Sequence, residues 1–117
     1  MQLQLTAQLI DTVLVLDCSG RLVSGEESDF FRHFMHGLLD VKAIVLNLAA
    51  LSYMDSGGLG SLVGAYSSAR MRDGHIKLAG LPPNTRDVLR VTKLLGVLEV
   101  YDTVEAAVRD FRKAAVA

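Results

Sequence analysis

The stretch Asp55-Ser56-Gly57-Gly58-Leu59-Gly60 contains the residues best suited to chemistry or binding. It lies between an apolar run and a segment with helical periodicity. A helix that begins here leaves backbone amides unpaired, and they carry a partial positive charge. Asp55 or Ser56 can cap these amides, while the glycines let another backbone or an anion approach closely. The stretch is therefore interpreted either as a plain capped turn or as a binding loop.

Two nucleotide-binding motifs are possible alternatives for this loop. A Walker loop ends in Gly-Lys-Ser/Thr, and that ending is absent after Gly60. Gly58, Gly60 and Gly64 imitate a dinucleotide fingerprint, but the next predicted strand ends in Ala79-Gly80 instead of the acidic residue that would bind the ribose. A small nucleotide-binding or catalytic protein is therefore the weakest of the functions considered. We expect no cofactor and no enzyme activity, because no nucleophile–base pair has a suitable sequence context.

Histidine and cysteine residues give weaker signals. His33 and His36 are three positions apart on a predicted helix, but a metal site needs further ligands, so we expect none. Cys18, the single cysteine, lies in a predicted core strand. It is interpreted as a small apolar filler and not as a nucleophile.

The elements that would position the loop alternate between strand and helix patterns. Alternation in this form predicts an α/β fold with a mixed, mostly parallel sheet in the order β-β-α-β-α-β-α-β-α. We expect a hairpin with its turn at Asp11-Thr12, and a first helix opened by a capping box from Ser24 to Glu27. Asp73-Gly74 should end the second helix, with Gly74 left-handed. The expected strands are 3–7, 13–18, 43–48, 76–79 and 97–100, and the expected helices are 24–38, 56–72, 82–95 and 103–111.

Length and charge restrict the class of protein. The 117 residues are half hydrophobic, enough for one domain over 1–117. A net charge of −1 favours neither nucleic acid nor an anionic membrane as partner. The apolar runs are shorter than the ~20 residues that span a bilayer, and residues 1–11 lack a signal-peptide pattern. We expect a soluble cytoplasmic protein.

The segment 44–60 resembles the STAS domain family, specifically its anti-sigma factor antagonists. The resemblance rests on the pattern strand-Asn-Leu-x-x-Leu-x-x-Met-Asp-Ser-x-Gly-Leu-Gly. It extends to the later Gly80-Leu81-Pro82 turn and to segment 94–98. It implies a mixed sheet backed by helices. It also implies partner switching: the unphosphorylated antagonist binds an anti-sigma factor that is a serine kinase, phosphorylation releases it, and a serine phosphatase restores it.

The sequence departs from the family pattern at the position that matters most for this switch. The family usually has a second hydroxyl residue, the phosphate acceptor, where this chain has Gly57. Members often carry Asp in place of Val23. Two functions therefore remain open: an antagonist in which Ser56 accepts the phosphate, and a constitutive STAS scaffold or adaptor in a signalling or transport assembly.

Overall fold

The computed structural model describes residues 1–116, where five strands and four helices follow one another in the predicted order. The predicted α/β class and the mixed sheet are confirmed. The elements are β1 Leu3–Ile10, β2 Val13–Leu22, α1 Glu26–His36, β3 Ala43–Met54, α2 Ser56–Arg70, β4 His75–Ala79, α3 Pro83–Val91, β5 Glu99–Tyr101 and α4 Val104–Val116.

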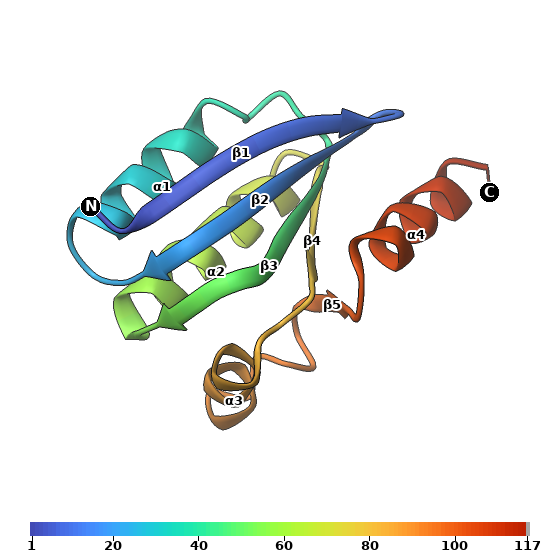
Figure 1. Ribbon diagram of the computed structural model, residues 1–117. Coiled ribbons are helices and arrows are strands. Elements are labelled where there is room, and N and C mark those ends of the chain that lie inside the picture. Colours follow the sequence, from blue (N-terminus) through green and yellow to red (C-terminus); the bar gives the residue numbers. More distant parts are fainter. Residues whose placement is uncertain (117) are drawn as a thin grey trace.

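The sheet has the spatial order β1-β2-β3-β4-β5. The hairpin of β1 and β2 is antiparallel, with its turn at Asp11-Thr12 as predicted, and β2 to β5 pair in parallel. In Figure 1 the strands lie in front of α1 and α2, and α4 lies to one side near β5. Within residues 1–116 no helix is both long and apolar enough to cross a membrane.

Two apolar clusters cover the two faces of the sheet. On one face, Leu16 and Leu46 belong to the same core as Phe31 of α1 and Leu62 of α2. On the other face, α4 packs on the sheet, with cluster members Val13, Val15, Val45, Ala79, Ala107 and Val108. The continuous apolar run that begins β3 is explained by this arrangement, because its residues are buried on both faces.

The strands β2 and β3 end side by side. Leu22, the last residue of β2, pairs with Met54, the last residue of β3, and both are buried. The prediction that β3 would end at Leu48 was wrong, because Leu51 and Met54 also reach the core and continue the strand. The segments that follow β2 and β3 therefore emerge together at one edge of the sheet.

The predicted capping box at the start of α1 is absent. The helix begins at Glu26, and its N-cap is Gly25, with no side-chain cap. The backbone amide and the hydroxyl of Ser24 are directed to the Asp55 carboxylate, and Glu27 accepts a hydrogen bond from the Gln2 amide at 2.7 Å. Both side chains thus have partners elsewhere in the chain, which competes with local capping.

Two other helix ends also differ from the prediction. The left-handed residue after α2 is Asp73, with φ 59°, and not Gly74. Aspartate tolerates this conformation better than most residues. The helix α3 ends at Val91, before the predicted Leu95, because Lys93 takes a left-handed φ of 62° that ends the helical path.

A buried ion cluster joins β4, β5 and α4. Lys77 of β4 is only 5% exposed, and its ammonium lies 2.9 Å from Glu99, 2.8 Å from Asp110 and 3.1 Å from the Tyr101 hydroxyl. Burial alone would lower the pKa of Lys77, but the hydrogen bonds to Asp110 and Glu99 outweigh burial and raise it. The same ammonium, with the Tyr101 hydroxyl, lowers the pKa of Asp110. β5 spans Glu99–Tyr101 and not the predicted 97–100, in register with Lys77.

We expect Lys77→Met to lower the free energy of unfolding at pH 7 by about 2–3 kcal/mol, since it leaves two carboxylates without their cation while both stay partly exposed. The pKa of Asp110 is lower in the folded state, so its stabilisation is present above the unfolded value and is lost as pH falls through the folded value. The difference in the free energy of unfolding between wild type and variant should therefore become smaller in acid. Urea titrations from pH 7 to 3 measure it, with exposed Lys93→Met as control; a gap independent of pH would contradict this account.

Candidate functional site

Asp55 is the first residue after β3 and the N-cap of α2. Its backbone is extended, with φ −103° and ψ −173°, and its carboxylate accepts a hydrogen bond from the Gly58 amide at 2.9 Å. The sequence allowed either Asp55 or Ser56 to be the helix cap, and the structure shows that it is Asp55. One of the unpaired amides at the start of α2 is satisfied in this way.

The same carboxylate holds the segment that follows β2. The Ser24 amide donates to both oxygens of Asp55, at 3.0 and 3.1 Å, and the Ser24 hydroxyl lies 3.5 Å from one of them. The Gly58 amide lowers the pKa of Asp55; burial opposes this, and the amide and hydroxyl of Ser24 lower the pKa further, so the net effect is a lowered pKa. Asp55 is therefore an ionised anchor for two segments and is poorly suited to act as a general base near neutral pH.

The predicted binding loop is the first turn of a helix. Ser56 and Gly60 are exposed and Gly57 is half-buried, whereas Gly58 and Leu59 are buried. Leu59 belongs to the core and serves packing. The part of the predicted site that a partner can reach therefore consists of Ser56, Gly57 and Gly60, next to the partly buried Asp55.

The glycines let α2 approach the end of β2. A Cβ on Gly58 would stand 1.9 Å from the Leu22 carbonyl oxygen, and a Cβ on Gly57 would stand 1.8 Å from the Ser24 hydroxyl oxygen. Ser24 is thus part of the site, although the sequence pattern assigned it to a helix cap. Parallel neighbouring strands end at the same sheet edge, and this rule is the signal that could have placed Ser24 beside Asp55.

Two large side chains lie at the same edge. Arg21 and Tyr53 pair across β2 and β3, Arg21 is exposed, and Tyr53 is 48% exposed. Val23, the other position at which the sequence departs from the expected family pattern, is buried, and its carbonyl accepts hydrogen bonds from the amide and the hydroxyl of Ser28. Position 23 therefore contributes no charge to this edge.

The other sequence candidates lie elsewhere. Cys18 is buried in β2, and burial, with a smaller effect of Asp17, raises its pKa to about 12. A thiol with this pKa stays protonated near neutral pH, which agrees with the predicted role as a core filler. His33 and His36 are exposed on α1.

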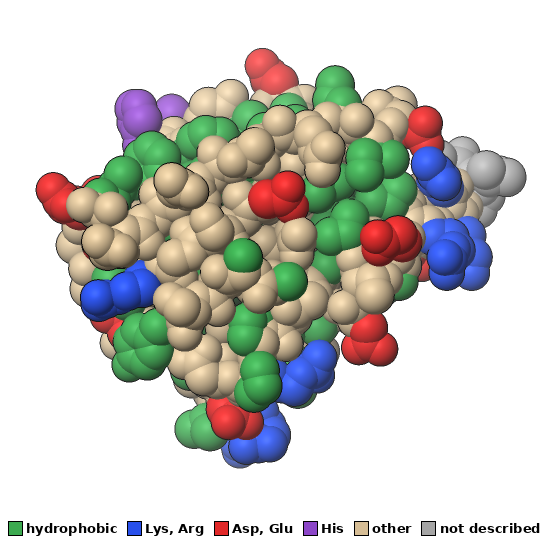
Figure 2. All heavy atoms as spheres, in the orientation of Figure 1, with side chains coloured by type: hydrophobic (Ala, Val, Ile, Leu, Met, Phe, Trp, Pro, Cys, Tyr) green, Lys and Arg blue, Asp and Glu red, His purple; other side chains and the backbone are tan. Residues whose placement is uncertain are grey.

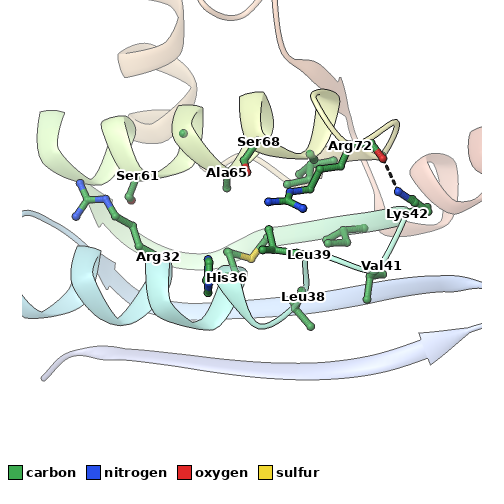
Figure 3. Close-up of a pocket in the computed structure, with 16 residues that line it drawn as sticks. Arg32, His36, Leu38, Leu39, Val41, Lys42, Ser61, Ala65, Ser68 and Arg72 are labelled. Carbon is green, nitrogen blue, oxygen red and sulfur yellow. Dashed lines mark hydrogen bonds between the residues drawn. The ribbon is translucent and has the colours of Figure 1, made fainter.

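A cavity of about 280 Å³ lies between α1 and α2, separate from residues 55–60 (Figure 3). Its walls include Met35, Ile44 and Ile76, and basic side chains, including Arg32 and Arg72, surround it. Neither Ser24 nor Ser56 is among the residues that line it. The cavity and the sheet edge are thus distinct features.

We expect Asp55→Ala to lower the free energy of unfolding by about 1–2 kcal/mol, because it removes a helix cap and the acceptor of the Ser24 amide. Asp55→Asn keeps one acceptor oxygen and should cost less. Because the folded pKa of Asp55 is lowered, its contribution is present above the unfolded pKa and is lost as pH falls through the folded one. Thermal unfolding at pH 7 and in acid measures this; an Asp55→Ala variant as stable as the wild type at pH 7 would show that the carboxylate is not the anchor.

Known proteins share this architecture. A family model described as the STAS domain matches residues 4–107. The anti-sigma F factor antagonist of Paenibacillus polymyxa is 30% identical over 105 residues, covering 87% of this chain and 89% of that protein. The unphosphorylated anti-sigma factor antagonist SpoIIAA has a TM-score of 0.80 at 23% identity, covering 94% of this chain and 97% of that one.

The phosphorylated form of SpoIIAA, a Bacillus cell fate determinant, has a TM-score of 0.70 at 24% identity, covering 92% of this chain and 96% of that one. At these identities the two SpoIIAA structures show a shared fold. The family model and the Paenibacillus relative go further, since each spans most of the chain. The chain therefore belongs to the STAS domain family, and anti-sigma factor antagonists are among its relatives.

Proposed function

We propose that the chain is a single STAS domain that works as an anti-sigma factor antagonist. In this proposal it binds an anti-sigma factor of the serine-kinase type, and so frees a sigma factor, at the edge where β2 and β3 end. The observation that carries the proposal is the exposed first turn of α2, held in place by Asp55 and flanked by Ser24.

The edge has properties that favour protein binding. Its backbone is fixed by hydrogen bonds from Ser24 and Gly58 to one carboxylate, so little conformational entropy is lost on association. Exposed Arg21 and Tyr53 are of the residue types that most often contribute large binding energies. A Cβ on Gly60 would have no other atom within 4 Å, so the first turn of α2 leaves room for a partner's side chains.

Binding fits the chemistry better than catalysis. Asp55 is ionised and engaged with backbone amides, and Cys18 is buried with a raised pKa. Neither group is prepared to act as a base or a nucleophile. The face in Figure 2 consists mostly of uncharged side chains and backbone, with Lys and Arg toward its margins, so this face does not have the basic patch that nucleic acid would require.

Phosphorylation at this edge would provide the release step. A phosphoserine adds about −1.5 to −2 charge near neutral pH. Placed beside ionised Asp55, this charge would be desolvated and repelled in an interface, so the complex would dissociate without refolding of the domain. A serine phosphatase would then regenerate the binding form. Ser56 is the exposed hydroxyl residue that remains in the motif itself.

A second function is favoured by Gly57. Without a hydroxyl at this position, the domain would be a constitutive scaffold or adaptor that binds its partner and is never released by phosphorylation. The two functions share the binding surface and differ in whether ATP dissolves the complex. Formation of a complex that persists with ATP would favour the scaffold.

The proposal predicts that the purified chain forms a stable complex with an anti-sigma factor of the serine-kinase type. Gly60→Arg should weaken binding at least tenfold, a loss of about 1.4 kcal/mol. This substitution adds bulk on the proposed surface, and it should not crowd the fold, since a Cβ at Gly60 has no neighbouring atom within 4 Å. Calorimetric titration measures it.

Gly96→Arg is the matched control, because Gly96 is equally exposed and open but lies just before β5. It should bind as the wild type does. Equal binding by Gly60→Arg and wild type would place the interface elsewhere. Absence of a complex with every anti-sigma factor of the source organism would contradict the proposed function.

A further inference from the structure

Ser24 occupies the space where a side chain at position 57 would stand. A Cβ on Gly57 would lie 1.8 Å from the Ser24 hydroxyl oxygen, 2.7 Å from its Cβ and 2.9 Å from its Cα. All three separations are below 3.0 Å, the limit that real Cβ contacts respect. A serine side chain therefore occupies the space beside Gly57, and it comes from the β2–α1 connection and not from α2.

The position of this hydroxyl is well defined. Both oxygens of the Asp55 carboxylate accept the Ser24 amide, and the hydroxyl points to the same carboxylate. Ser24 is exposed, so an enzyme can reach it. The segment that carries Ser24 is therefore joined to the start of α2 by the same carboxylate that caps the helix.

Ser56 has a different direction. Successive residues of an α-helix point about 100° apart around its axis. The side chain of Ser56 consequently leaves α2 along another direction than a side chain at position 57 would. A partner that binds the surface at Gly57 contacts the Ser24 hydroxyl there.

We propose that Ser24 is the phosphate acceptor of this chain. The inference rests on the proposed function, in which a serine kinase binds at this edge. The Ser24 oxygen attacks the γ-phosphorus of ATP held by that kinase. A serine–phosphate bond forms, the bond to the β-phosphate oxygen breaks to give ADP, and the serine proton passes to a base of the kinase.

The modification would act on the anchor of the site. Phosphoserine at position 24 would bring a second negative group next to the Asp55 carboxylate, which already lies 3.5 Å from the hydroxyl oxygen. Repulsion would weaken the contact between the β2–α1 connection and α2, and it would place charge at the centre of the binding edge. Release of the partner follows from both effects.

The test uses a kinase that forms the complex in titration, with ATP, and locates the phosphate by tandem mass spectrometry. Trypsin places Ser24 in peptide 22–32 and Ser56 in peptide 43–70. We expect phosphate on Ser24 in the wild type, at least tenfold less incorporation in Ser24→Ala, retention in Ser56→Ala and recovery in Ser24→Thr.

Each other outcome overturns the inference in a distinguishable way. Phosphate located on Ser56 within peptide 43–70, with none on Ser24, would make Ser56 the acceptor and leave the proposed function intact. A stable complex with no phosphate on the chain would support the unswitched scaffold. If no kinase binds in the calorimetric titration described above, the proposed function itself is contradicted.

A second set of variants tests the juxtaposition without a kinase. Gly57→Ala should lower the melting temperature because it collides with Ser24, and Ser24→Gly should recover part of that loss in the double variant. Gly60→Ala, which meets no neighbour, should cause no loss. Equal melting temperatures for Gly57→Ala and Gly60→Ala would show that Ser24 does not fill this space and would overturn the inference.

Discussion

The carboxylate of Asp55 joins the two segments on which the candidate site depends. It accepts the Gly58 amide at the start of α2 and the Ser24 amide after β2. Without this carboxylate, the parallel strands β2 and β3 would still end together. The hydrogen bonds that position the β2–α1 connection against the start of α2 would be lost. The lowered pKa of Asp55 follows from these same donors, so the anchor is ionised near neutral pH.

Gly57 and Gly58 allow the close packing that this anchor requires. The lack of a side chain at Gly58 leaves room for the Leu22 carbonyl, and the lack of one at Gly57 leaves room for the Ser24 side chain. Both glycines therefore show that α2 lies close to the end of β2. The absence of a hydroxyl at Gly57 left two functions open, one with Ser56 as the phosphate acceptor and one without a phosphorylation switch. The packing offers another interpretation, because the hydroxyl absent from one segment is present on its neighbour.

Local patterns were enough to predict the element order, the hairpin turn and the helix faces. The Phe31 and Met35 stripe of α1, for example, depends only on helical spacing. Features set by distant residues were missed: β3 runs on to Met54 because the core receives Leu51, and Ser24 leaves the predicted capping box for Asp55. Spacing along the chain cannot report that the Ser24 amide donates to the Asp55 carboxylate, 31 residues away, and not to the nearby carboxylate of Glu27.

The most direct test of the binding edge is an NMR titration of the ¹⁵N-labelled chain with its anti-sigma factor. The account predicts that amide signals of residues 21–25 and 53–60 shift or broaden first, while those of α4, on the opposite face, stay unchanged. Changes confined to α4, or to the walls of the cavity between α1 and α2, would contradict the claim that the joined ends of β2 and β3 form the interface.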